Sequence, residues 1–136
     1  MMRFLFLLFL LFQTPAHAQD FVVIVNPGGP LAKADMETIR DIYLGETRFA
    51  EGIRLAPVNP AEGRLKDVFL EKVVKMDSKG HRLHWIKKVF REGLMIPPSY
   101  ATPSEIAEFV RKEKGAVGYI PAHGSSALEG VVVIGP

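Results

Sequence analysis

The turn Pro60-Ala61-Glu62-Gly63-Arg64 holds the residues best suited to bind a small anion. A helix is predicted to begin at about Arg64, and the free backbone N–H groups and the dipole of a helix N-terminus attract negative charge. Gly63 would let a ligand approach the backbone closely, and Arg64 could hold an oxyanion with two parallel hydrogen bonds. The alternative is that Glu62 itself satisfies the helix end and that Arg64 is solvated.

His81 and His84 lie three residues apart in a second predicted helix, a spacing at which two imidazoles can reach one metal ion. A metal site needs a third ligand, and no residue stands at a convincing position for one. His123 follows a later strand, but the sequence does not place it near the pair. We therefore expect surface histidines on a basic helix, and neither a metal nor another cofactor.

The helix that carries these histidines is rich in positive charge. Its cationic residues are Lys79, Arg82, Lys87, Lys88 and Arg91. Such a face could attract an anionic surface, a lipid or a protein partner, although charge on the solvated side of an amphipathic helix is the commoner arrangement. Trp85 lies beside this face and is expected to pack in the core.

Sequence patterns that accompany catalysis are missing. No serine stands in a G-x-S-x-G nucleophile elbow, and no glycine-rich phosphate loop of the nucleotide-binding types occurs. The turn Asn26-Pro27-Gly28-Gly29-Pro30 follows a predicted strand, but Pro30 and the glycine spacing do not suit a nucleotide. We therefore predict that the protein is not an enzyme.

The amino-acid composition further limits the classes of protein to which this chain can belong. The chain has 136 residues, of which 48% are hydrophobic and 24% are charged, values that suit one packed domain. A formal net charge of +2 is too small to indicate a nucleic acid as the main partner. The sequence contains no cysteine, which excludes disulfides, thiolate nucleophiles and cysteine-ligated metals.

Residues 1–18 are expected to be a cleaved secretory signal peptide. Arg3 precedes an apolar run from Phe4 to Phe12, and Ala16-His17-Ala18 fits the A-x-A pattern of a cleavage site. The run is shorter than the about 20 residues that span a bilayer. Cleavage after Ala18 would release residues 19–136 into the periplasm as one domain, which has no later apolar stretch long enough to insert into a membrane.

Predicted strands and helices alternate along the chain. We expect strands at residues 21–25, 53–58, 116–120 and 131–134, and helices at residues 34–44, 64–76, 78–91 and 103–114. The helix at 78–91 is expected to bury Leu83, Ile86, Val89 and Phe90, and Thr102 with Glu105 is expected to cap the last helix. This alternation predicts a single small α/β domain with a mixed, mostly parallel sheet flanked by helices.

Three segments resemble the phosphate-type substrate-binding proteins of ABC transporters. They are Val23-Ile24-Val25-Asn26-Pro27, Asp41-Ile42-Tyr43-Leu44-Gly45 and Gly115-Ala116-Val117-Gly118-Tyr119-Ile120. In that family a hinge strand ends in an Asn-Pro turn, a helix closes with an Ile-Phe-x-Gly-like sequence, and a Gly-Ala-Ile-Gly-Tyr-like strand leads back out of the same lobe. The resemblance implies the fold of one lobe of a type 2 periplasmic binding protein. It also places Asn26 at the cleft, where its amide could donate to an anion.

The sequence also departs from this family. Family members clamp the anion between two lobes, whereas this chain resembles one lobe and its hinge strands. Where the family has an Arg/Ser-Gly-Thr-like turn, this chain reads Ala61-Glu62-Gly63-Arg64, which has no hydroxyl group.

We therefore expect an exported, non-enzymatic solute-binding-like domain. Its ligand would be phosphate or another small oxyanion, held by Asn26, Gly63 and Arg64, and an ABC transporter is the partner that the resemblance implies. The alternative is a protein-interaction module that keeps the fold but has lost ligand binding, and that pairs with another protein or with a second copy of itself.

Overall fold

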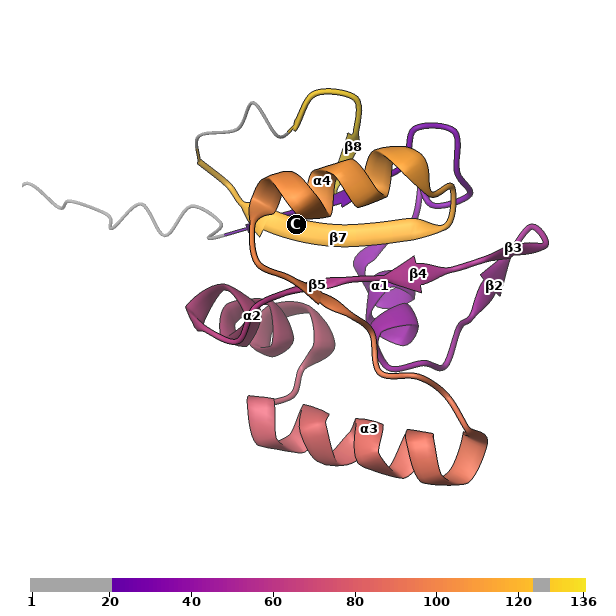
Figure 1. Cartoon of the computed structure of the whole chain (residues 1–136), viewed down its shortest axis with the longest axis vertical. Coiled ribbons are helices and arrows are strands. Elements are labelled where there is room, and N and C mark those ends of the chain that lie inside the picture. Colours follow the sequence, from indigo (N-terminus) through magenta and orange to yellow (C-terminus); the bar gives the residue numbers. More distant parts are fainter. Residues whose placement is uncertain (1–20, 124–127) are drawn as a thin grey trace, which may run out of the picture.

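Strand β1 (Phe21–Val25) lies inside a four-stranded sheet because its apolar, mostly β-branched residues can be covered on both faces. The computed structural model describes residues 21–123 and 128–136, so the predicted signal peptide lies outside the described residues. The sheet has the order β4-β7-β1-β8 (Figure 1). β1 lies between β7 (Ala116–Pro121) and β8 (Val132–Gly135), and β4 (Ala56–Pro57) pairs with the other side of β7.

The prediction of an α/β domain with a mixed sheet flanked by helices is confirmed, but the expectation that the sheet is mostly parallel is wrong. β1 pairs antiparallel with both β7 and β8, and only β4 and β7 pair in parallel within this sheet. The reason is topological. The chain enters the domain through β1 and returns through β7, and these two strands lie side by side in opposite directions.

Two small sheets complete the strand structure. The expected strand at 53–58 is divided into β3 (Ile53–Arg54), which forms an antiparallel hairpin with β2 (Phe49–Ala50), and β4. β5 (Asn59–Pro60) continues the direction of β4 and pairs in parallel with β6 (Ser99–Tyr100). These short strands connect the main sheet to the helices that follow them.

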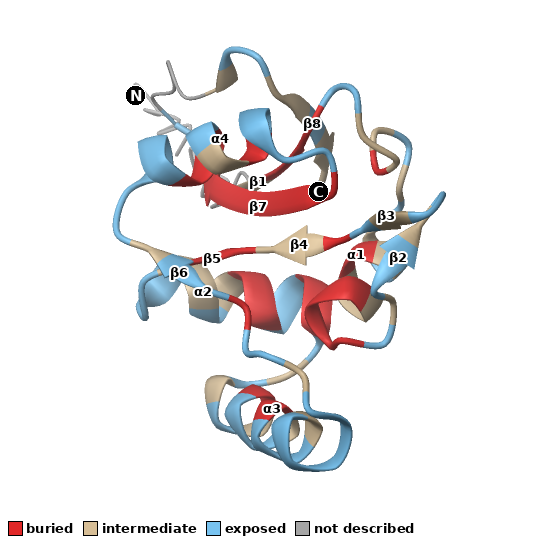
Figure 2. Ribbon diagram, turned by 45° about the vertical axis from the view of Figure 1, so that its right-hand side comes forward, coloured by how far each residue is buried: buried red, intermediate tan, exposed pale blue. Residues whose placement is uncertain are grey.

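Helices cover both faces of the main sheet (Figures 1 and 2). One face packs on α1 (Met36–Tyr43) and on α2 (Arg64–Phe69), which continues as a π-helical turn, η1 (Leu70–Val74). The other face packs on α4 (Pro103–Lys112). Alternate residues of β1 serve the two cores, because Val23 lies in the α1 cluster and Ile24 in the α4 cluster.

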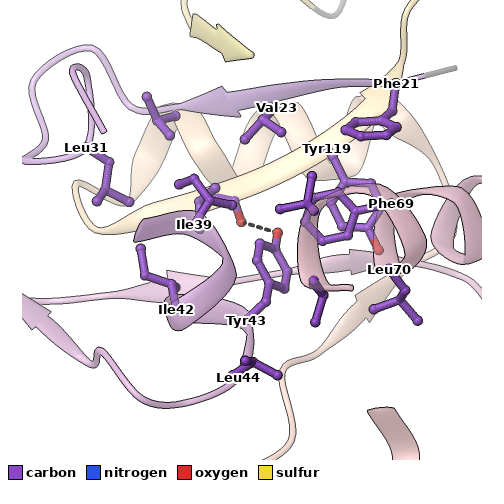
Figure 3. Close-up of a cluster of buried hydrophobic side chains, with 14 of the residues drawn as sticks. Phe21, Val23, Leu31, Ile39, Ile42, Tyr43, Leu44, Phe69, Leu70 and Tyr119 are labelled. Carbon is purple, nitrogen blue, oxygen red and sulfur yellow. Dashed lines mark hydrogen bonds between the residues drawn. The ribbon is translucent and has the colours of Figure 1, made fainter. Parts of the chain in front are cut away.

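Aromatic rings fill the core under α1 and α2 (Figure 3). The rings of Phe69 and Tyr119 stack with centroids 3.7 Å apart, and Phe21 and Tyr43 contact Phe69 edge-on. The buried Tyr43 hydroxyl donates to the carbonyl oxygen of Val58 at 2.7 Å. This bond joins α1 to the end of β4 and satisfies the one polar atom of a fully buried side chain.

Helix α3 (Ser78–Glu92) lies outside these two layers, and the expectation that it buries its apolar residues is wrong. Leu83, Ile86, Val89 and Phe90 are exposed, whereas the inner side of α3 carries His81 and Trp85. Trp85 Nε1 donates to the carbonyl oxygen of Tyr43 at 3.0 Å. Hydrophobic periodicity failed here because α3 packs against the carbonyl end of α1, which requires hydrogen-bond donors.

The start of α4 agrees with the sequence. The Thr102 hydroxyl accepts a hydrogen bond from the backbone N–H of Glu105 at 3.2 Å, and it lies 3.1 Å from the Glu105 carboxylate, to which it donates. The predicted N-cap is therefore confirmed. Throughout the described part of the chain, no helix has the length and apolar character needed to cross a membrane.

Candidate functional site

The carboxyl ends of the parallel strands β5 and β6 lie at one edge of the molecule, and a helix begins after each of them (Figure 2). β5 leads through residues 61–63 into α2, and β6 leads through residues 101–102 into α4. Ligands of open α/β sheets bind beyond the carboxyl ends of parallel strands, where helix N-termini supply N–H donors. This edge is therefore the first candidate site.

Gly63 is the N-cap of α2 and leaves the helix end open. Within the described structure, no side chain forms a capping hydrogen bond at this position. A Cβ atom on Gly63 would meet no atom of the described residues within 4 Å, so these residues leave the space in front of Gly63 open. Gly63 and Arg64 are both exposed. Backbone N–H groups, the helix dipole and a guanidinium group thus share one accessible end of α2.

Glu62 does not cap this helix. Its carboxylate instead pairs with Lys66 Nζ at 2.6 Å, one helical turn further along. The hydrogen bond from Lys66 is the main cause that lowers the pKa of Glu62. The acid that precedes the helix is therefore ionised and held against a cation, beside the open N–H groups.

Asn26 is buried and uses its side chain inside the protein. Its Nδ2 donates to the carbonyl oxygens of Val110 at 2.9 Å and Arg111 at 3.0 Å, in the last turn of α4. Its Oδ1 accepts from the backbone N–H of Gly28 at 2.8 Å. The Asn26 amide, which was expected to donate to an anion, thus joins the end of β1 to the end of α4.

The structure does not bring Asn26 together with Gly63 and Arg64. Asn26 follows Val25, which pairs with Val117 near the start of β7. β5 leads toward the other end of β7, where the Tyr119 hydroxyl donates to Asn59 Oδ1 at 2.8 Å. Asn26 and Gly63 therefore leave the sheet at opposite ends, and a phosphate-sized ion at Gly63 does not reach Asn26.

The role of Asn59 was not predicted from the sequence. Asn59 is buried, its backbone N–H donates to the carbonyl oxygen of Pro98, and its side chain holds Tyr119. These bonds fix the strand that leads into the candidate site. An asparagine beside a proline predicts a turn from sequence, and nothing in the sequence indicates its partner 60 residues away.

The two helical histidines have separate environments. His84 Nε2 lies 2.7 Å from the carbonyl oxygen of Leu44, whereas His81 is buried and its Nε2 has no hydrogen-bond partner. Across residues 21–123 and 128–136, no group of three or more His, Cys, Asp or Glu side chains could hold a metal ion. Both histidines face the body of the protein, so the prediction that they lie on the surface is wrong for His81.

Burial of His81 predicts a loss of stability in acid. Burial lowers the pKa of the His81 imidazole below its ordinary value, and Lys66 and His84 add to this effect, while the Tyr43 backbone and Glu62 oppose it. The unfolded chain therefore takes up a proton before the folded chain does. The free energy of unfolding should fall as the pH is lowered from about 7 to about 5.

This expectation can be measured by urea unfolding of the wild type and of His81→Gln at both ends of that pH range. The variant cannot take up the proton, so its stability should depend less on pH. An equal loss in the two proteins would show that other groups cause the acid sensitivity.

A second candidate is a cavity of about 530 Å³ between α3, β4 and the segment 94–98. Its lining is mostly apolar and includes Trp85, Leu94 and Phe109. Arg48 and Arg54 also line it, and no carboxylate of residues 21–123 or 128–136 does. The volume lies in the range of small-molecule sites, and the lining suits an apolar molecule that carries a negative charge.

Comparisons with known proteins add a likeness in fold. Neither a protein-family model nor a curated protein sequence matches this chain. A structure from Clostridium perfringens, described as a phosphate ABC transporter substrate-binding protein with bound phosphate, is similar over 85% of this chain, with a TM-score of 0.60 and 18% identity. An ABC-type phosphate transport receptor from Vibrio cholerae is similar over the same share, with a TM-score of 0.58 and 14% identity.

This chain spans less than half of each of those proteins, 44% and 45% of their lengths. It has the fold of one lobe of such a protein. At these identities the likeness concerns the fold, while the ligand and the partners are matters for proposal.

Proposed function

We propose that this chain is a solute-binding-like domain that binds a phosphate-like oxyanion at the start of α2. The observation that carries the proposal is the open N-terminus of α2 at Gly63, which lies beyond the carboxyl end of β5. The fold supports it, because one structure of similar fold is described with bound phosphate.

In this proposal the anion is bound and not transformed. Backbone N–H groups at the start of α2 donate to its oxygens, and the Arg64 guanidinium supplies positive charge. The Glu62–Lys66 pair stands beside the site, so the charge of Glu62 opposes an arriving anion. Binding in one lobe alone leaves the anion partly exposed, and an ABC transporter component is the proposed partner that would receive it.

Arg64→Ala should weaken binding of the oxyanion by about 1.5–3 kcal/mol, which is the usual range for a hydrogen bond to a charged group. Glu62→Gln should strengthen binding, because it removes the nearby negative charge. A thermal-shift screen of phosphate, sulfate, molybdate and carboxylates would select the ligand, and calorimetric titration of the three proteins would measure its affinity.

The matched control is Arg91→Ala, which removes an exposed arginine near the end of α3 and should leave the affinity unchanged. Equal affinities in all four proteins would mean that the anion binds elsewhere. A response confined to apolar carboxylates would assign the ligand to the cavity beside Trp85, Arg48 and Arg54.

The second candidate function is a protein-interaction module that keeps the fold without a ligand site. It is favoured by large apolar side chains that remain exposed, namely Phe49, Phe90, Met95 and Ile96. Patches of this kind mark interaction surfaces in soluble proteins. In the same screen, saturating ligand should add about 2.7 kcal/mol of stability at a hundred times its dissociation constant. Flat melting curves for every ligand would favour this second function.

We also propose that the domain is exported to the periplasm and begins at Gln19 after cleavage of residues 1–18. The proposal rests on Arg3, the apolar run from Phe4 to Phe12 and the sequence Ala16-His17-Ala18. N-terminal sequencing of the protein recovered from a periplasmic extract should read Gln19-Asp20-Phe21. Recovery of a chain that still begins at Met1 would contradict export by cleavage.

A further inference from the structure

Helix α3 presents an apolar stripe to solvent. Leu83, Ile86 and Phe90 follow one another at three- and four-residue spacing and therefore share one side of the helix. Phe90 is 86% exposed, Leu83 is 49% exposed and Ile86 is 42% exposed. The opposite side of α3 carries the buried His81 and Trp85. α3 thus buries His81 and Trp85 on its inner side and leaves this apolar stripe on its outer side.

Cations border this stripe on both sides. At about 100° per residue, Arg82 falls on one flank of the stripe and Lys87 and Arg91 fall on the other. All three are exposed, as is Lys79 at the N-terminal end of the stripe.

The positive charge of the protein is concentrated here. The segment Ser78–Glu92 has five basic residues and one acidic residue, a formal charge of +4, whereas the whole chain has +2. The acidic residue, Glu92, pairs with Lys88, which also reaches Glu46 on the body of the protein. The outward cations therefore face solvent without acidic residues of α3 among them.

From this arrangement we propose that α3 rests on an anionic lipid bilayer. Leu83, Ile86 and Phe90 enter the boundary between headgroups and acyl chains, while the flanking cations contact lipid phosphates and extend along the surface. An apolar stripe bordered by lysine and arginine is the pattern of helices that lie in the membrane interface. α3 lies at the outer edge of the fold, so no other helix or strand of the described residues stands between its outer side and a flat surface (Figures 1 and 2).

Charge also decides against a second copy of the chain on this surface. Two α3 helices face to face would bring the same exposed cations together, and like charges at close range oppose association. A negatively charged bilayer complements the exposed cations of α3 and also covers its apolar stripe.

Vesicle binding tests the proposal. A chain that starts at Gln19 keeps every described residue and lacks the N-terminal apolar run, so lipid binding by that run is removed. We expect it to sediment with vesicles of equimolar phosphatidylcholine and phosphatidylglycerol and not with vesicles of phosphatidylcholine alone. High salt should release it, because exposed charges are screened.

Two variant pairs separate the charge from the apolar stripe. Lys87→Gln with Arg91→Gln should lower the partition coefficient about thirtyfold, since each cation near such a surface contributes about a factor of five. Lys33→Gln with Lys114→Gln removes the same charge from other exposed positions and should have a smaller effect. Phe90→Ser should lower the coefficient about tenfold, and Phe49→Ser, which truncates an exposed phenylalanine of β2, should not.

Insertion of α3 into the bilayer can be measured separately by tryptophan fluorescence. Trp85 is the single tryptophan and is buried, so the change in fluorescence on adding vesicles to Phe90→Trp reports the new residue. A blue shift with anionic vesicles supports insertion. The proposal is overturned if the protein ignores anionic vesicles, or if α3 variants and controls lose binding equally. It is also overturned if sedimentation equilibrium shows a dimer that Phe90→Ser dissociates, which would assign the stripe to a second copy.

Discussion

Gly29→Ala should lower the free energy of unfolding by about 3 kcal/mol or more, whereas Gly28→Ala should change it little. A Cβ atom on Gly29 would lie 1.8 Å from the carbonyl oxygen of Lys114 and 2.9 Å from its carbonyl carbon. Both are backbone atoms just before β7, so relief requires the turn to move away from the sheet. A Cβ atom on Gly28 would meet only Asn26 Oδ1, at an ordinary 3.5 Å.

The two substitutions form a matched pair because they add the same methyl group at neighbouring positions of one turn. Urea unfolding of the wild type and both variants measures the difference, with the slope of the unfolding curve as the check that the native state remains compact. A Gly29→Ala protein as stable as the wild type would mean that this turn does not pack closely against Lys114.

The parts of the fold that could be predicted from the sequence are those that local chemistry decides. β1 is a run of apolar residues, α1 has one apolar face that ends at Gly45, and α4 begins at the Thr102 N-cap. Gly45 has a φ of +72°, which suits the glycine expected at that helix end. Each of these features depends on residues within a few positions of one another.

The parts that could not be predicted depend on distant partners. The direction of β1 relative to β7 is decided by residues almost a hundred positions apart. The apolar periodicity of α3 is real, but its apolar side faces outward because Trp85 and His84 meet carbonyl oxygens of Tyr43 and Leu44. Periodicity locates an apolar stripe and does not show what covers it.

The candidate site shows the same division. Gly63 and Arg64 were proposed from the helix start, which is a local feature, and the structure places them at the N-terminus of α2. Asn26 was added from the family resemblance, and the structure places it at the other end of the sheet. The family resemblance therefore located Asn26 at the end of a strand, but it did not predict which groups its side chain would hydrogen-bond.

Asn26→Ala should lower the free energy of unfolding by about 3 kcal/mol, because it leaves two carbonyl oxygens at the end of α4 without their donor. Those oxygens belong to Val110 and Arg111, and Asn26 Nδ2 is within 3.0 Å of both. Asn26→Asp should be at least as damaging near neutral pH although it has the same shape, because a carboxylate cannot donate to carbonyl oxygens and repels them.

Urea unfolding together with titration of the best oxyanion separates structure from ligand binding. If Asn26 positions α4, both variants lose stability while the folded fraction keeps its anion affinity, and Asn26→Asp recovers part of its stability in mild acid, where a protonated carboxyl group can donate one hydrogen bond. If Asn26 instead contacted the ligand, both variants would keep the stability of the wild type and bind the oxyanion more weakly. Because the Nδ2 donor is committed to two backbone oxygens, the first result is the one that the geometry requires.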